Sequence, residues 1–99
     1  MKERTKILLV VAPTIVECRK TLDVFGVDPG AEIRSVTKAG ALRGWSRGTP
    51  FICQNRDTWL RDGRGTELDH TLSAMMMSGQ LRIASPRDLA EFQLERSAR

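Results

Sequence analysis

One stretch decides the fold of this chain: Lys6-Ile7-Leu8-Leu9-Val10-Val11-Ala12-Pro13-Thr14-Ile15-Val16-Glu17. Its apolar run does not alternate with polar residues, and it stops at a proline that leads directly into a helix start. Such runs are typical of strands covered on both faces, as in parallel sheets between layers of helices. The stretch therefore predicts an α/β fold.

The residues after this strand predict a helix but no phosphate-binding loop. Thr14 can cap the first turn with its hydroxyl while Glu17 reaches back to the Thr14 amide, which is the capping-box pattern. Gly26 ends the helix. The apolar stripe of the helix consists of Ile15, Cys18, Leu22 and Phe25. The junction holds neither Gly-x-Gly-x-x-Gly nor Gly-x-x-x-x-Gly-Lys, so the usual backbone cradle for phosphate is missing.

Three further strands are predicted along the chain. A second compact apolar run at residues 50–54 predicts another inner strand. Residues 32–37 have few apolar positions, which predicts an edge strand. Apolar and polar residues alternate over residues 81–84, which predicts a strand with one solvent-exposed face. Residues 38–49 leave room for one helical turn at most. Right-handed crossovers with the apolar runs at the centre give the spatial order 2-1-3-4 in a mainly parallel sheet. We therefore expect a three-layer, Rossmann-like domain.

Two further helices complete this prediction. Thr66 is expected to cap a helix that ends at Gly79. Its apolar face consists of Leu68, Leu72, Met75 and Met76. A terminal helix begins with the pattern of Ser85, Pro86 and an acidic first turn, and its inward-facing residues are Leu89 and Phe92.

Length and composition indicate one soluble domain. The chain has 99 residues, of which 40% are hydrophobic and 28% charged. We expect one domain over residues 1–99, frayed at 1–5 and 97–99. No apolar stretch approaches the roughly 20 residues of a membrane span, and the first run lacks a signal-peptide cleavage site. Cys18 and Cys53 have no Cys-x-x-Cys spacing, which indicates buried thiols in a reducing, cytoplasmic compartment.

The positive charge is concentrated in the middle third of the chain. Residues 33–66 contain seven basic and two acidic residues, a net charge of +5, whereas the remainder carries −1. Arginines interleaved with tryptophans suit a nucleic-acid surface, where tryptophan stacks on bases and arginine neutralises phosphates. They equally suit a protein interface, where both residue types are common anchors. The predicted contact surface consists of Arg43, Trp45, Arg56, Trp59, Arg61 and Arg64. The alternative is that both tryptophans fill a small core and the arginines are solvated.

A second candidate site lies where the carboxyl ends of the two inner strands meet. In a sheet of this order, ligands favour the crevice outside those ends. The free amides at Thr14 and the cation of Arg56 could bind a carboxylate or phosphate there, beside Asn55. Glu17, as part of the cap, weakens the field that such an anion would experience. The whole crevice is predicted to be formed by Pro13, Thr14, Gln54, Asn55, Arg56 and Asp57.

Catalytic and metal-binding groups are scarce. His70 is the only histidine, on the solvent side of a helix, and no nucleophile lies in a strained turn motif. The aspartates of residues 57–69 form no acidic pair at the end of an apolar strand, and the neighbouring arginines oppose a cation. We therefore expect no enzyme, no metal ion and no cofactor.

The run Met75-Met76-Met77 offers a possible dimer contact. Neighbouring helix residues point about 100° apart, so all three methionines cannot face one sheet. We expect Met77 to be exposed, where it could join a dimer or partner interface. Loose packing at the helix end is the alternative.

The strand-cap-helix opening, the piece Ala41-Leu42-Arg43-Gly44 and the strand Gly48-Thr49-Pro50-Phe51-Ile52 lie within residues 6–60. Together they resemble small uncharacterised proteins encoded by actinobacterial phages, especially mycobacteriophages. The ratio of 12 Arg to 4 Lys suits a high-GC coding source. The resemblance implies an accessory function in the early lytic phase, such as binding a host protein to redirect or poison it, and it supplies no catalytic motif.

The same opening is similar to the second RecA-like half of superfamily-two helicases. In that half, a strand-Thr-helix unit leads to a strand like residues 50–54. The arginine-finger segment is missing here, and one half alone could not hydrolyse ATP.

We therefore expect a non-catalytic protein that binds a macromolecule through the basic Trp/Arg-rich surface. A host or phage protein is the favoured partner, and no membrane is involved. Nucleic-acid binding through the same arginines is one alternative. Nucleotide or anion binding at the carboxyl end of the sheet is another, and a homodimer remains open.

Overall fold

The computed structural model describes residues 7–27 and 32–92, so the ends expected to fray lie outside the described residues. Its elements, in chain order, are β1 (Leu8–Val11), α1 (Ile15–Phe25), β2 (Ile33–Val36), the 3₁₀ helix η1 (Ala39–Leu42), β3 (Thr49–Ile52), α2 (Arg56–Asp62), α3 (Thr66–Met77), β4 (Leu81–Ile83) and α4 (Pro86–Ala90). The strands form one sheet in the order β2-β1-β3-β4, and every pair is parallel. The predicted fold class and strand order are confirmed.

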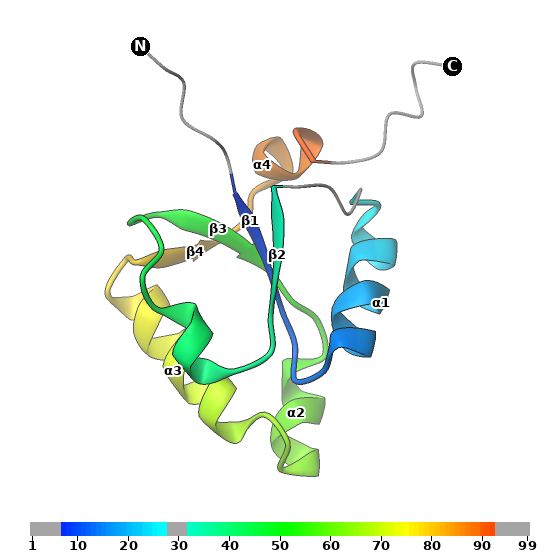
Figure 1. Ribbon diagram of the computed structural model, residues 1–99, viewed down its shortest axis with the longest axis vertical. Coiled ribbons are helices and arrows are strands. Elements are labelled where there is room, and N and C mark those ends of the chain that lie inside the picture. The colour runs from blue at the N-terminus through cyan, green and yellow to red at the C-terminus, as the bar shows by residue number, and fades with distance from the viewer. Residues whose placement is uncertain (1–6, 28–31, 93–99) are drawn as a thin grey trace.

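β1 lies at the centre of a three-layer arrangement. Figure 1 shows α1 on one side of the sheet and η1 with α3 on the other. All four residues of β1 are fully buried, because helices cover both of its faces. This double coverage explains why the apolar run does not alternate. β2 is an edge strand, as predicted, and its residues Arg34 and Ser35 are exposed.

α1 begins and ends where the sequence predicts. The Thr14 Oγ1 accepts a hydrogen bond of 3.2 Å from the Glu17 backbone amide, and Gly26 ends the helix with a φ of 66°. The capping box is not completed, because the Glu17 carboxylate binds Arg64 instead of the Thr14 amide. Ile15 is 48% exposed and does not belong to the buried stripe, because the first turn of α1 lies beyond the end of β1 (Figure 1).

α2 is a helix that the sequence analysis did not predict. It follows β3 directly, after Asn55, which adopts the left-handed conformation with a φ of 58°. α3 then begins one residue away from the expected cap, because Gly65 occupies the N-cap position and Thr66 is already helical. A Cβ atom on Gly65 would lie 2.7 Å from the Cβ of Trp59, so only glycine fits this turn.

The last strand and helix follow their sequence signals. Ser85 and Asp88 form a complete capping box at the start of α4, with Pro86 in the first turn. Leu89 and Phe92 are half-buried against the core. Among the described residues, no helix has the length and apolarity needed to span a membrane.

Candidate functional site

The structure divides the predicted contact surface between the two ends of the sheet. Arg56, Arg61 and Arg64 follow β3 and lie beyond its carboxyl end, in α2 and the turn to α3 (Figure 1). Arg43 and Trp45 belong to the loop between η1 and β3, which leads to the amino end of β3. These residues therefore do not form one continuous face.

Trp59 is part of the core and not of a contact surface. Its side chain is 1% exposed and is the largest fully buried side chain of the described residues. It packs against Gly65, and a Cβ atom on that glycine would meet both Trp59 and Pro13 within 3.2 Å. Its predicted role as a partner-binding residue is wrong, because the buried side chain is not accessible to a partner.

Arg56 joins α2 to α3. Its Nε donates to the Asp69 Oδ1 at 2.6 Å, and its Nη2 donates to the Ser73 Oγ at 3.0 Å. The Met76 sulfur lies 3.8 Å from the Nη1. The guanidinium is therefore neutralised and held by α3, which removes the cation that the predicted anion site requires.

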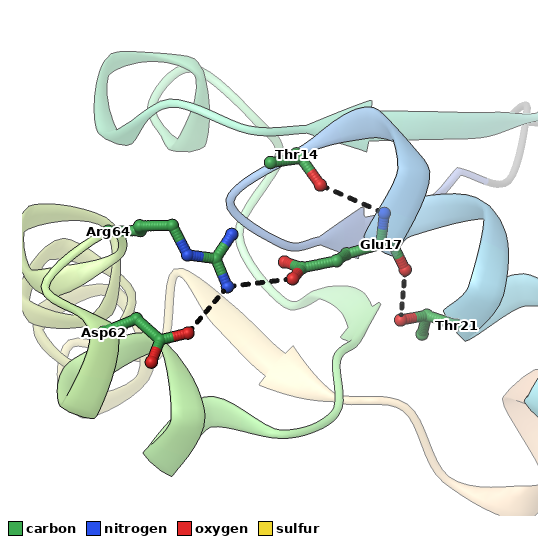
Figure 2. A network of polar contacts seen from close by, with 5 residues as sticks. All are labelled: Thr14, Glu17, Thr21, Asp62 and Arg64. Atoms are coloured by element: carbon green, nitrogen blue, oxygen red, sulfur yellow. Dashed lines mark hydrogen bonds and ion pairs between the residues drawn. The ribbon is translucent and has the colours of Figure 1, made fainter.

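Arg64 connects the start of α1 to the turn before α3, as Figure 2 shows. Its Nη2 donates to the Glu17 Oε2 at 3.0 Å and to the Asp62 Oδ2 at 3.2 Å. These hydrogen bonds, with that to Glu17 the stronger influence, raise the pKa of Arg64. Arg61 also has an acidic partner, because its Nη2 lies 3.6 Å from the Asp57 Oδ2 in an exposed pair.

The crevice at the carboxyl ends of β1 and β3 is small. Its volume is about 120 Å³, whereas pockets for small-molecule ligands usually have roughly 300–1,000 Å³. Gln54 and Asn55 line it as predicted. Pro13, Thr14, Arg56 and Asp57 were also expected there, and they do not line it. Glu17 and Lys20 line it as well, so its lining carries one negative and one positive side chain.

A larger pocket of about 460 Å³ lies at the opposite end of the sheet. Its walls come from the start of β1, the loop before β3, β4 and α4, and we call it the amino-end pocket. Its apolar lining includes Ile7, Trp45, Pro50 and Phe92, and its charged lining consists of Arg47, Arg82, Arg87, Asp88 and Glu91. Sequence analysis missed this pocket, because the rule for parallel sheets directs attention to the carboxyl end.

The loop that contributes Trp45 is fixed by hydrogen bonds. The indole Nε1 donates to the Ala41 carbonyl at 2.8 Å, and the Trp45 carbonyl accepts from the Gln80 Nε2 at 2.6 Å. The side chain is half-buried against the core. Trp45 is thus held in one orientation at the wall of the pocket.

The arginines of the amino-end pocket differ in their partners. Arg82 forms an ion pair with Asp88. The Arg47 Nη2 donates to the Ser78 carbonyl at 2.6 Å, at the end of α3, which leaves its charge without an acid. Arg87 has no acidic partner among the described residues, and the same holds for Arg43 outside the pocket.

The two cysteines and the histidine lie outside the amino-end pocket. Burial raises the pKa of both Cys18 and Cys53, which keeps the thiols protonated at neutral pH. His70 is exposed on α3, and no group of three His, Cys, Asp or Glu residues in residues 7–27 and 32–92 is placed to hold a metal ion. Met77 is 89% exposed, as predicted.

Comparisons of the chain with models of protein families, with curated proteins and with solved structures find no match. The resemblance to phage proteins therefore stays a prediction. Among the described residues, the amino-end pocket is larger than the carboxyl-end crevice, and its arginines Arg47 and Arg87 have no acidic partner.

Proposed function

We propose that this protein is a non-catalytic binding module that holds a partner protein at the surface around the amino-end pocket. The pocket carries this proposal, because its volume of about 460 Å³ is in the range of ligand sites and its wall contains a fixed, half-buried tryptophan. Of the predicted contact residues, Trp45 lines the pocket, and Arg43 lies two positions before it in the same loop. Arg47 and Arg87 join them.

A protein partner fits the lining better than nucleic acid does. The pocket combines the apolar groups of Pro50 and Phe92 with the acids Asp88 and Glu91. The positive charge of the lining is interrupted by the Arg82–Asp88 ion pair and by apolar groups, whereas nucleic-acid sites track the backbone with continuous positive charge. Tryptophan and arginine around an apolar centre are typical of the energetically dominant residues in protein interfaces. The phage resemblance favours a host protein as that partner.

The first test is capture of a partner from a nuclease-treated mycobacterial lysate by the immobilised 99-residue chain. We compare the wild type with an Arg43→Glu, Arg87→Glu double variant. An Arg19→Glu, Arg61→Glu double variant is the matched control, because all four arginines are exposed and both variants change the net charge equally. We expect the wild type and the control to retain the same protein and the first variant to lose it.

Two results would contradict this proposal. Retention of no protein removes the binding function, and equal retention by the two double variants removes the assignment of its surface. A partner that the chain retains from an untreated lysate but not from a nuclease-treated one indicates the nucleic-acid alternative. That alternative also predicts an affinity for duplex DNA that falls with salt, with a log-log slope of about −0.9 per contacted phosphate.

A further inference from the structure

We infer that the amino-end pocket accepts a short segment of the partner protein in which an acidic side chain neighbours an apolar side chain. This inference rests on the proposed function and specifies the chemistry of the segment that the pocket recognises. It follows from which charges of the lining are already used and which are free.

Arg82 and Asp88 use each other's charge. The Arg82 Nη2 donates to the Asp88 Oδ1 at 3.0 Å, and the Arg82 Nη1 bonds the other carboxylate oxygen. That second oxygen also accepts from the Ser85 backbone amide at 2.9 Å and from the Ser85 hydroxyl at 3.0 Å. The pair therefore presents neither a free cation nor a free anion to a ligand.

The lining contains three arginines and two acids, so its net charge is positive. Glu91 already has an interaction within the chain. Arg47 uses one of its five N–H donors for the Ser78 carbonyl, and Arg87 uses none in a bond with a described residue. A planar guanidinium binds a carboxylate through two parallel hydrogen bonds. The lining is therefore complementary to an acidic side chain.

The rest of the lining suits an apolar side chain. Trp45, Pro50 and Phe92 provide apolar surface, and Ile7 adds to it at the start of β1. The volume of about 460 Å³ suits a segment of a few residues better than a whole helix. The two hydrogen bonds of Trp45 hold the loop in place before binding, which reduces the entropy lost on association.

The test is a selection of peptides from a random displayed library on the intact 99-residue protein. We expect enrichment of sequences in which Asp or Glu lies within two residues of Leu, Phe or Trp. A synthetic copy of an enriched peptide then binds the wild-type protein. Its affinity falls about tenfold when the acid is changed to the corresponding amide, as expected for loss of a charged hydrogen bond.

Two protein variants locate the binding. Arg87→Glu is expected to weaken the peptide about tenfold or more, and Arg61→Glu, with the same charge change at the other end of the sheet, by less than about twofold. If Arg87→Glu destabilises α4, Arg87→Gln replaces it, and we expect that variant to weaken peptide binding as well. Thermal unfolding shows whether each variant is folded. An equal loss in the Arg87 and Arg61 variants overturns the inference.

Other outcomes overturn it as well. The selection could enrich no peptides, or it could enrich basic ones. The amide peptide could bind as tightly as the acidic peptide, or an oligonucleotide could compete fully with the peptide for the pocket. Self-association that Arg87→Glu abolishes would make a second copy of this chain the occupant. If a lysate protein still requires Arg43 and Arg87 while the selection fails, the proposed function stands and only the acidic-apolar segment is wrong.

Discussion

Among the described residues, three arginines lie at the carboxyl end of the sheet and three line the amino-end pocket, and the two groups differ in their ion pairs. At the carboxyl end, Arg56, Arg61 and Arg64 all have acidic partners. At the amino end, only Arg82 does, and Arg47 and Arg87 keep their charge without a described acid. The pocket at the first end measures about 120 Å³ and that at the second about 460 Å³. Ion pairing, and not the count of basic residues in a segment, decides where charge is available to a partner.

The two tryptophans repeat this contrast. Trp59 at the carboxyl end is fully buried in the core, whereas Trp45 at the amino end is half-buried and lines the pocket. The carboxyl end is therefore a structural junction of α1, α2 and α3. The amino end has the larger pocket and the arginines without a described acidic partner, and we therefore propose it as the binding surface.

The largest effect is expected from Trp59→Ala. Removing a fully buried indole leaves a cavity and lowers the free energy of unfolding by about 3–5 kcal/mol. Denaturant unfolding measures this, with Trp45→Ala as the comparison. We expect the Trp45 variant to lose clearly less, because its side chain is only half-buried. A loss below about 1 kcal/mol for Trp59→Ala would mean that the carboxyl end is not sealed.

Gly65→Ala tests the same junction without removing the indole. The new Cβ would collide with the Cβ of Trp59 at 2.7 Å and would lie 3.1 Å from its Cγ. We expect a loss of about 1–3 kcal/mol in unfolding free energy, as for overpacked cores. Gly40→Ala is the control, because no atom lies within 4 Å of its added Cβ and the change should stay within about 0.5 kcal/mol. Equal stability of the two variants would contradict the packing described for Trp59.

Arg56→Met and Arg61→Met compare the contributions of the partly buried and the exposed ion pair at the carboxyl end to stability. Asp69 is 19% exposed and would lose the partner at 2.6 Å, so we expect a loss of about 1–2 kcal/mol in unfolding free energy. Arg61→Met should change it by less than about 0.5 kcal/mol, since exposed pairs contribute little. Denaturant unfolding compares the two variants, and a cost at Arg61 as large as that at Arg56 would refute this distinction.

Asp88→Asn tests the fixed pair of the amino end. The hydrogen bond from Arg82 is the main cause that holds the pKa of Asp88 well below its usual range, followed by the Ser85 amide. We expect a loss of about 1 kcal/mol at neutral pH, as for other helix caps. The pKa of Asp88 is lower in the folded than in the unfolded protein. The stabilisation by its carboxylate is therefore complete above the unfolded pKa of about 4, and it is lost as the pH falls through the folded pKa.

The measurement is thermal unfolding of wild type and Asp88→Asn between neutral and strongly acidic pH. The difference in stability should narrow as the solution becomes more acidic. A difference that is independent of pH would show that the carboxylate charge of Asp88 does not stabilise α4.

The sequence predicted the features whose causes are local. The apolar run of β1, the cap at Thr14, the helix end at Gly26 and the helix start at Ser85 and Pro86 all depend on residues within a few positions of one another. The crossover rules then specify the strand order from the order of the runs. The structure confirms each of these.

The features that sequence analysis missed depend on residues far apart in the chain. Arg64 binds Glu17 47 positions away, and Arg56 binds Asp69 13 positions away. Neither pairing has a sequence signal, so both arginines were expected to be free. α2 has seven residues and starts from a left-handed Asn55, which is too short for a periodic pattern. The amino-end pocket needs four separate segments, and no single segment indicates it.

The most direct test of the contrast uses fluorine NMR of the protein labelled with 5-fluorotryptophan, which gives one resonance for each tryptophan. The titrant is the protein that the wild-type chain retains from the lysate. We predict that the Trp45 resonance moves or broadens on binding while the Trp59 resonance keeps its position. A complex in which only the Trp59 resonance responds, or in which neither responds, would contradict binding at the amino end of the sheet.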